Sequence, residues 1–116
     1  MKSSPDGTVV IGNPARSTVY ITQDNPAADY TPAIKYGELV FVTAHNDRLS
    51  PHSASSANTT TIEKIRSILA DFKEEDYFLC TGAPAHMAMS AAYLGSRLKK
   101  LLVWDNRSND YFVVKM

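Results

Sequence analysis

The sequence predicts an α/β fold: a single small domain with a mainly parallel, Rossmann-like layered sheet, two main helices and a C-terminal antiparallel hairpin. Two apolar runs without alternation, residues 77–80 and 101–104, are typical of strands covered on both faces in a parallel sheet. Between them, residues 84–94 are mostly small and apolar and have the length of a helix. A second helical pattern, residues 59–72, comes before this strand–helix–strand unit.

The helix of the central unit begins at a Gly-Pro turn. Pro84 suits the first helical turn, where its missing N–H leaves nothing unpaired, and Gly95 suits the helix end. Because small side chains let a helix lie close against a sheet, we expect residues 84–94 to be buried over much of their surface. Cys80 lies inside the preceding apolar run, so we expect a buried thiol that takes no part in a disulfide.

The other helix has a recognisable start and one apolar face. Thr60 and Glu63 have the spacing of a capping box, which predicts that the helix begins near Thr59. Apolar side chains recur on one face at Ile62, Ile65, Leu69 and Phe72. The acidic run at residues 74–76 follows, and we interpret it as a solvated turn.

The remaining elements complete the sheet. Residues 17–22 are rich in β-branched side chains and predict the first strand. Residues 31–37 predict one helical turn, and residues 39–42 predict a second buried strand. At the C-terminus, residues 111–114 are predicted to pair back on the 101–104 strand as an antiparallel edge.

Length and composition limit the domain organisation and the kind of partner. With 116 residues the chain predicts one α/β domain, residues 17–116, preceded by a flexible N-terminal arm, residues 1–16. Its 12 basic residues balance 12 acidic ones, which argues against a binder of duplex nucleic acid and favours a homo-oligomer. The apolar runs are too short for a membrane helix, so no membrane association is predicted.

The order of elements places a ligand site at one edge of the sheet. Both helices follow strands, so their N-termini should meet at the carboxyl edge, where open α/β sheets bind ligands. Helix N-termini offer free N–H groups and a partial positive charge, and nearby hydroxyls add donors. We therefore predict a cradle for a small anionic molecule, for example a nucleotide, formed by Thr81, Gly82, Ala83, His86, Ser50, Ser56, Thr59 and Thr60.

Simpler interpretations of the same residues stay open. Small residues at a strand-to-helix turn serve packing in any such unit, and the turn lacks the glycine spacing and the lysine of a phosphate-binding loop. The helix dipole disfavours a charged His86, so this side chain is expected to be a neutral donor to a ligand or a half-buried cap of the turn. His45 and His52 lack a recognised ligand spacing and are interpreted as solvated, so no metal or cofactor is predicted.

Several short motifs occur together in a fixed order along roughly residues 18–115. They are Val19-Tyr20-Ile21, Thr31-Pro32-Ala33, Tyr36-Gly37-Glu38-Leu39-Val40, Leu49-Ser50-Pro51, Asp71-Phe72, Asp76-Tyr77, Gly82-Ala83-Pro84 and Lys100-Leu101-Leu102-Val103-Trp104-Asp105 with Tyr111. Their joint order resembles a group of small uncharacterised proteins of tailed bacteriophages, and the resemblance implies a phage origin and a place in the host cytoplasm. This chain departs from the pattern by a longer N-terminal arm and a longer Ser/His-rich loop after Ser50.

Three functional hypotheses follow. The first is a binding module that sequesters an anionic ligand, such as a nucleotide signal of host immunity, without catalysis; this would be a sponge-type anti-defence protein. The alternative is a protein–protein interaction module that inhibits or redirects a host enzyme through an edge strand, the arm or exposed aromatic side chains such as Tyr30, Tyr36 and Tyr111. A third is a hydrolase that acts on a nucleotide through His86, although neither a nucleophile elbow nor a triad order is present, so no enzyme is predicted.

Overall fold

The computed structural model describes residues 2–3, 9–10, 17–52 and 56–116, and it confirms the predicted α/β class. A five-stranded sheet has the order β4-β3-β5-β6-β7. Four strands are parallel, and β7 runs antiparallel to β6 as the C-terminal hairpin predicted. The strands are β3 (Thr18–Ile21), β4 (Glu38–Phe41), β5 (Tyr77–Leu79), β6 (Lys100–Asp105) and β7 (Asp110–Lys115).

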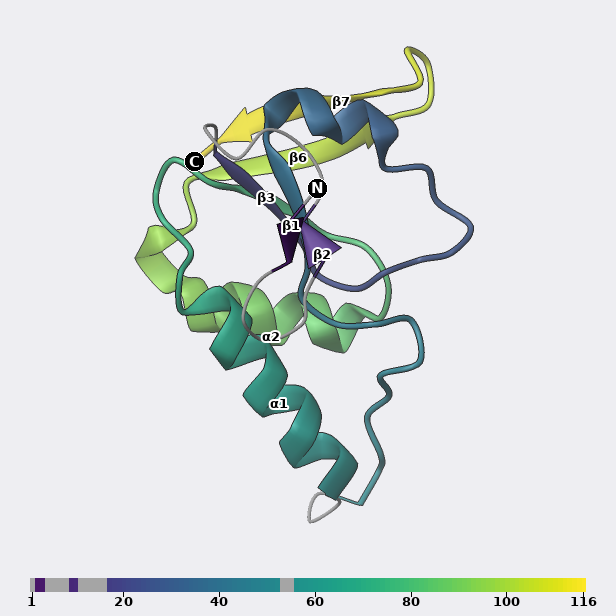
Figure 1. Ribbon diagram of the computed structural model, residues 1–116, viewed down its shortest axis with the longest axis vertical. Helices are drawn as coiled ribbons and strands as arrows, with labels where there is room; N and C mark the ends of the chain where they lie inside the picture. Colours follow the sequence, from purple (N-terminus) through teal and green to yellow (C-terminus); the bar gives the residue numbers. More distant parts are fainter. Residues whose placement is uncertain (1, 4–8, 11–16, 53–55) are drawn as a thin grey trace.

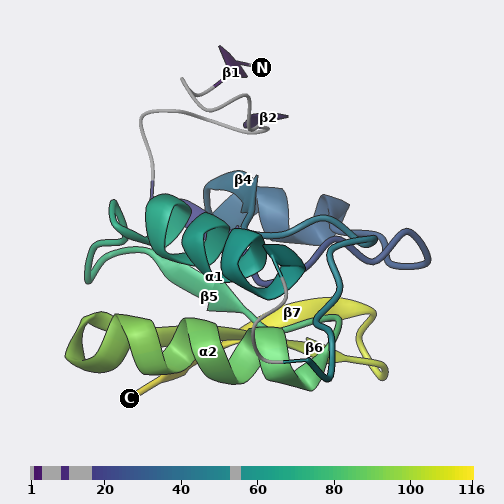
Figure 2. The ribbon, with the colours of Figure 1, turned by 90° about the horizontal axis from the view of Figure 1, so that it is seen from below.

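Helices cover both faces of this sheet. The helices α1 (Ser56–Leu69) and α2 (Pro84–Leu94) lie side by side on one face, and α2 continues into the short 3₁₀ helix η2 (Gly95–Arg97). The 3₁₀ helix η1 (Thr31–Tyr36) lies on the other face (Figures 1 and 2). The crossovers through α1 and α2 advance across the sheet in one direction and the crossover through η1 in the other. Right-handed connections therefore place η1 opposite α1 and α2.

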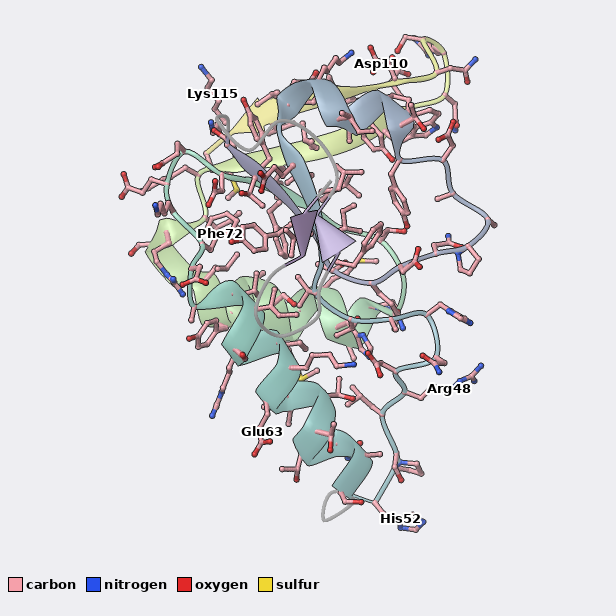
Figure 3. The ribbon with its side chains drawn as sticks, in the orientation of Figure 1. Arg48, His52, Glu63, Phe72, Asp110 and Lys115 are labelled. Carbon is pink, nitrogen blue, oxygen red and sulfur yellow. The ribbon has the colours of Figure 1, made fainter. Side chains whose placement is uncertain are left out.

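A separate apolar cluster fills each of the two layers. On the η1 side, Val19, Ile21, Ala33, Leu79 and Leu102 are buried together. On the α1 and α2 side, Tyr20, Ile65, Leu69, Phe72 and Phe78 form the second cluster, and the rings of Tyr20 and Phe72 are 5.2 Å apart. Figure 3 shows Phe72 in the interior and Glu63 on the outer side of α1, as the predicted apolar face requires. Continuous apolar strands are thus explained by burial on both faces.

The strand order fixes where the connections reverse direction. Counted from β3, the order is 2-1-3-4-5, the arrangement of flavodoxin-like sheets, here with an antiparallel last strand. The chain leaves β3 toward β4 on one side, and β5 is the neighbour of β3 on the other side. The switch point therefore lies at the carboxyl ends of β3 and β5.

The N-terminal segment is described only in part. Two short strands, β1 (Lys2–Ser3) and β2 (Val9–Val10), pair antiparallel to each other. The rest of the predicted arm, residues 1, 4–8 and 11–16, lies outside the described residues, as do residues 53–55.

Two expectations about the helices were wrong. Within the described residues the helix α1 already includes Ser56, so Thr60 and Glu63 lie inside it and form no capping box at its start. In α2 only His86, Ser90 and Leu94 are buried, whereas Ala85, Ala88 and Ala92 are exposed. These buried residues are four apart and form a single stripe against the sheet. Small side chains expose little apolar area, so they are tolerated on the solvent face as well.

Two side chains beside β5 also differ from expectation. Asp76 is buried, and its two carboxylate oxygens accept hydrogen bonds from the N–H groups of Thr18 (2.9 Å) and Lys73 (2.8 Å). It therefore ties the start of β3 to the turn before β5. Cys80 is exposed, because β5 ends at Leu79 and the chain turns there.

The edge of the sheet at β7 is partly closed by η1. The Tyr36 hydroxyl donates a hydrogen bond to the carbonyl of Tyr111 at 3.0 Å. The Asp110 carboxylate accepts from the N–H of Tyr111 at 2.8 Å and also pairs with Lys35. Both backbone groups of Tyr111 are thus occupied within the chain, and this part of the edge is protected against pairing with another strand.

Candidate functional site

The switch point is closed by hydrogen bonds of the protein itself. Thr22 follows β3 and Thr81 follows β5. The Thr22 hydroxyl donates to the Thr81 carbonyl at 2.6 Å and accepts from the Thr81 N–H at 2.9 Å. A ligand placed directly between the ends of β3 and β5 would have to break this reciprocal pair.

Gln23 extends the closure toward α2. Its side-chain oxygen accepts from the N–H of Ala83 at 2.7 Å. Its amide nitrogen donates to the carbonyls of Ala44 (3.1 Å), His45 (3.4 Å) and Asp47 (3.1 Å). One buried side chain therefore joins the loop after β4 to the first turn of α2.

Gly82 is required by this arrangement. Its backbone has a φ of +91°, which residues other than glycine rarely adopt. A Cβ added to Gly82 would also lie 2.4 Å from Oε1 and 2.5 Å from Cβ of Gln23, closer than atoms can approach. The glycine predicted as part of a ligand cradle thus has a packing role in the structure.

Few N–H groups remain free at the start of α2. Ala83 donates to Gln23, Pro84 has no N–H, and the N–H of His86 donates to the Ala83 carbonyl at 3.0 Å. Ala85 is the remaining residue of this turn with an N–H that the helix cannot satisfy. The predicted cradle of several backbone amides is therefore reduced to one donor at α2.

His86 is buried, with 1% of its surface exposed, and its protonation follows from its neighbours. Its Nδ1 lies 3.0 Å from the hydroxyl of Thr43, and that hydroxyl donates its single proton to the Thr22 carbonyl at 2.7 Å. Nδ1 must therefore carry a proton and donate it to Thr43. Burial lowers the pKa of His86, which favours the neutral ring despite the opposing effect of Asp47. His86 was predicted to donate a hydrogen bond to a ligand, but in the structure its Nδ1–H donates to the Thr43 hydroxyl.

A first cavity, which we call the His86 pocket, has a volume of about 380 Å³. His86 and Ala85 of α2 form one wall, and Asp47, Arg48 and Leu49 of the loop after β4 form the other. Figure 3 shows Arg48 on this loop. Burial alone would raise the pKa of Asp47, but hydrogen bonds from Lys64 (2.7 Å) and the Ala44 N–H (2.7 Å) outweigh it and lower this pKa. Asp47 is therefore a carboxylate at neutral pH.

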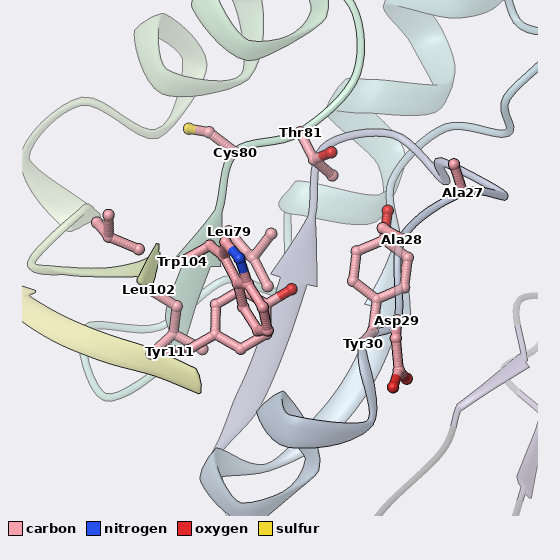
Figure 4. Close-up of a pocket in the computed structure, with 11 residues that line it drawn as sticks. Ala27, Ala28, Asp29, Tyr30, Leu79, Cys80, Thr81, Leu102, Trp104 and Tyr111 are labelled. Carbon is pink, nitrogen blue, oxygen red and sulfur yellow. The ribbon is translucent and has the colours of Figure 1, made fainter. Parts of the chain in front are cut away.

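A second cavity, which we call the aromatic pocket, has a volume of about 480 Å³. It opens at the carboxyl ends of β5 and β6 on the η1 side of the sheet, and the loop before η1 closes it (Figure 4). The rings of Trp104 and Tyr111 meet edge to face at 4.9 Å, and Tyr30 lies across the gap from them. Thr81 lies at one end and Asp29 at the other. Trp104 is 40% exposed, so its ring is accessible from this pocket.

The hydroxyls in the aromatic pocket keep their protons. Burial raises the pKa of Tyr111, and the neighbouring Tyr30 and Asp29 raise it further. Burial likewise raises the pKa of Tyr30, whose oxygen accepts a hydrogen bond from the Asn25 N–H at 2.9 Å. Asp29 is exposed, and its pKa is lowered by hydrogen bonds from Thr31. The pocket thus combines neutral hydroxyl donors with one carboxylate at its rim.

The predicted site residues divide into two groups. Thr81 lines the aromatic pocket, Ala83 and His86 line the His86 pocket, and the exposed Gly82 lies between them in the chain. The second group, Ser50, Ser56, Thr59 and Thr60, lines neither pocket.

The hydroxyl-rich segment has a structural role at its first residue. Asn58 accepts from the Ser50 N–H at 2.6 Å and donates to the Ser50 carbonyl at 3.0 Å, while the Ser50 hydroxyl accepts from the His52 N–H at 3.2 Å. Ser56, Thr59 and Thr60 are exposed in the first turns of α1. Figure 3 places His52 beside this end of α1 and Asp110 at the opposite end of the molecule.

Other residues of both pockets were not predicted. Trp104 was interpreted as part of a buried strand, and Tyr30 and Tyr111 as exposed aromatic side chains, although both are buried. For Gln23 the sequence indicated only a polar residue in the turn after the first strand. No spacing along the chain brings residues 23, 30, 47, 104 and 111 together, so only the folded chain could assemble them.

Metal and membrane features were searched within the described ranges. Residues 2–3, 9–10, 17–52 and 56–116 contain no group of three or more His, Cys, Asp or Glu side chains that could hold a metal ion. None of the helices described is both long and apolar enough to cross a bilayer.

Comparisons with known proteins give one family. Searches of the curated proteins and of the solved structures found no match to the chain. The family model described as "Phage Pam3 gp32-like protein" matches residues 9–116, which is nearly the whole chain. The chain therefore belongs to the family of phage Pam3 gp32-like proteins.

Proposed function

We propose that this phage protein is a binding module that captures a small molecule with a flat ring, a nucleotide being the class we favour, and holds it without transforming it. The aromatic pocket is the observation that carries this proposal. Its volume of about 480 Å³ lies in the usual range for small-molecule sites, roughly 300–1,000 Å³. An apolar cavity with a few polar groups is also the usual composition of such sites.

The walls of the aromatic pocket suit a nucleobase. A base that stacks on an aromatic side chain gains about 1–3 kcal/mol, and Trp104 offers the largest ring in the pocket. The Tyr111 hydroxyl can bond to a ring nitrogen or a carbonyl group, whereas the Thr81 side chain is engaged with Tyr30. Asp29 at the rim can accept hydrogen bonds from an exocyclic amino group.

The charge of the aromatic pocket supports a binding mode in which the phosphate lies outside it. Asp29 lines the rim, and neither Lys nor Arg is among the described lining residues. The base would therefore supply most of the affinity, and the phosphate would point toward solvent. This is a different basis for nucleotide capture from the amide cradle predicted from the sequence.

Two features support storage of the ligand rather than turnover. Cys80 contributes to the rim of the aromatic pocket, but its sulfur points away from the gap between Trp104 and Tyr30 (Figure 4). The neutral tyrosines and the rim carboxylate Asp29 do not form a pair of nucleophile and base. In a phage protein, capture without turnover fits sequestration of a nucleotide signal of host immunity in the host cytoplasm.

The single tryptophan makes this proposal directly testable, since Trp104 is the only one in the chain. We would titrate the protein with nucleoside monophosphates, cyclic nucleotides and ADP-ribose, recording tryptophan fluorescence and the melting temperature. The expected result is quenching of Trp104 together with stabilisation by at least one nucleotide. Tyr111→Phe, which removes only the hydroxyl, should weaken binding several-fold. Phe112→Ala is the matched control, because Phe112 is the exposed next residue and does not line this pocket.

The proposal is wrong if no nucleotide changes either signal. It is also wrong if binding survives Tyr111→Phe and Trp104→Ala unchanged, because the ligand would then lie elsewhere.

A second candidate function rests on the outer surface of β7. Phe112 and Val114 are 46% and 36% exposed, and the neighbouring Met116 is 63% exposed. Exposed apolar side chains in one strand favour a protein–protein interaction module that inhibits or redirects a host enzyme. A pull-down from host lysate with wild-type protein and with the Phe112→Lys, Val114→Lys double variant separates the two functions. A stoichiometric partner that only the wild type retains supports this second candidate.

A further inference from the structure

We propose that two copies of this chain pair through β7, antiparallel and around a two-fold axis at Val114, so that two five-stranded sheets join into one. This surface is separate from both pockets, and the pairing does not depend on nucleotide capture. Three features of β7 support it: free backbone groups on its outer edge, exposed apolar side chains beside them, and a register in which the strand is complementary to itself.

The hydrogen-bond pattern shows which backbone groups of β7 point outward. The strand is the last of the sheet and has β6 as its neighbour on one side. The Met116 N–H donates to the Lys99 carbonyl at 2.8 Å, so the alternate residues 114, 112 and 110 also turn their backbone groups toward β6. Val113 and Lys115 therefore turn theirs away from β6.

Only one end of this outer edge is closed within the chain. The backbone groups of Tyr111 also point outward, and they are bonded to Asp110 and Tyr36. The outward groups of Val113 and Lys115 have no hydrogen-bond partner among residues 2–3, 9–10, 17–52 and 56–116. Strand β2 lies against β4, at the other edge of the sheet, so it does not cover β7. An open edge of this kind is a template for a further strand.

The exposed apolar side chains of β7 lie on one face of the same segment. Tyr111 and Val113 pack against the apolar cluster on the η1 side of the sheet. Since side chains alternate along a strand, Phe112, Val114 and Met116 lie on the opposite face. They are 46%, 36% and 63% exposed, so α1 and α2 leave them largely uncovered although these helices cover this face elsewhere. A strand paired with β7 would bring its own side chains over this row.

A second copy suits this segment because the segment is complementary to itself. In an antiparallel pair centred on Val114, Val113 faces Lys115 of the second copy, and each such pair exchanges two N–H···O=C bonds. On the exposed face, Phe112 faces Met116 of the second copy, and the two Val114 side chains face each other. Each apolar side chain thus meets an apolar one, as a two-fold interface requires. A strand of another protein would have to present the same pattern by coincidence.

The charges permit this pairing. An edge lysine commonly prevents strand pairing, but in this register Lys115 faces Val113 and not the Lys115 of the second copy. The chain has 12 basic and 12 acidic residues, so no net charge keeps two copies apart. Tyr111, where η1 closes the edge, lies outside the paired residues 112–116 in both copies.

The first test measures the mass and the amide exchange of the wild-type protein. Because the interface is small, the mass in solution would be recorded by light scattering from about 10 µM to about 1 mM. We expect it to rise from the 12.8 kDa of one chain to twice that value. In the concentrated sample the N–H groups of Val113 and Lys115 should become protected from hydrogen exchange, and dilution should remove this protection.

Lys115 offers a matched pair of variants. Lys115→Pro removes an N–H that points away from β6, so it leaves the bonds to β6 intact and should abolish the dimer over this concentration range. Lys115→Ala removes the same side chain but keeps the N–H, and it should form the dimer as readily as the wild type.

Substitutions at Val114 test the position of the two-fold axis. Val114→Glu and Val114→Lys each place like charges opposite each other, and each should weaken the dimer about tenfold. An equimolar mixture of the two variants should restore it, because unlike charges then meet at the axis. If either variant fails to fold, the exchange protection of Val113 and Lys115 in the wild type still decides.

Three results would overturn the proposal: a wild-type mass of one chain up to about 1 mM, a dimer that survives Lys115→Pro unchanged, or a dimer in which Val113 and Lys115 stay unprotected. A monomer that retains a stoichiometric host protein through Phe112 and Val114 would also overturn it, in favour of the second candidate function. Nucleotide capture is judged separately, by the fluorescence of Trp104.

Discussion

The side-chain oxygen of Gln23 lies 2.7 Å from the backbone nitrogen of Ala83 and accepts its hydrogen bond. In α/β sheets a ligand often takes the N–H groups at this turn, but here the protein supplies the acceptor itself. The open volume is displaced to two cavities, one lined by Thr81 and the other by Ala83 and His86. This displacement is the reason why the proposed nucleotide site depends on aromatic rings instead of an amide cradle.

Gly82 should tolerate substitution less well than Gly95. Gly82→Ala would combine an unfavourable φ of +91° with a Cβ 2.4 Å from Gln23, and we expect a loss of about 3 kcal/mol in the free energy of unfolding. Gly95 also has a positive φ, +54°, but its Cβ would meet nothing within 4 Å, so Gly95→Ala should cost only about 1–2 kcal/mol. Urea unfolding of both variants measures the difference. Equal losses of unfolding free energy in the two variants would show that the Gln23 side chain can move aside at no energetic cost.

Asp76→Asn should destabilise the protein although it removes a charge from a buried site. Both oxygens of Asp76 accept from backbone N–H groups, of Thr18 and Lys73, and an asparagine would point its own NH₂ at one of these donors. We expect a loss of about 1–3 kcal/mol, measured by urea unfolding at pH 7. The exposed neighbour Glu75→Gln is the control and should change little. Burial raises the pKa of the Asp76 carboxyl, which means that burial by itself disfavours the charge. A neutral or stabilising effect of Asp76→Asn would therefore show that relief of this charge outweighs the lost hydrogen bond, and it would contradict this account.

His86 should make the fold sensitive to mild acid. Burial lowers its pKa below the ordinary value of 6.5, so the unfolded chain binds a proton more readily than the folded one. The stability that neutral His86 contributes is present above pH 6.5 and is lost as the pH falls from there toward the lower pKa of the folded state. We expect the free energy of unfolding to fall between about pH 7 and pH 5.

The matched variants for this pH effect are His86→Asn and His52→Asn. His86→Asn should flatten the slope between pH 7 and pH 5, and His52→Asn, at an exposed histidine that lines neither pocket, is the control for the substitution itself. Carboxylates such as Asp47 and Asp110, whose pKa values are lowered, lose their contributions only at lower pH. A slope that persists in His86→Asn would assign the effect to another group.

Cys80 should react with a thiol reagent in the folded protein. The side chain is exposed, and the surrounding protein partly shields it from water, which raises its pKa above the ordinary value of 9.0. Labelling should therefore go to completion without denaturant, but slowly at pH 7 and faster as the pH rises. Cys80→Ser supplies the blank. If labelling required denaturant, the Cys80 thiol would be buried, as the apolar run at residues 77–80 predicted.

The fold class could be predicted because its physical requirement acts locally. Strand β5, for example, is covered on both faces, because Leu79 lies in one apolar cluster and Phe78 in the other. This burial demands apolar residues at consecutive positions. The helix at residues 56–69 was found from its apolar face, but its start was misplaced by the Thr60 and Glu63 pair. Asp76 and Cys80 were misjudged because the burial of one residue depends on where the neighbouring strand ends.

The candidate site could be predicted only in outline. The sequence determined that a strand ends near Thr81 and that a helix begins at Pro84, because a turn and a helix start depend on adjacent residues. Only the tertiary structure decided that the Gln23 side chain fills this turn and that the Thr43 hydroxyl accepts the hydrogen bond of His86 Nδ1. It also decided that Trp104 and Tyr30 face one cavity. These contacts join residues far apart in the chain, and their geometry is set by the twist and order of the strands, which no local pattern encodes.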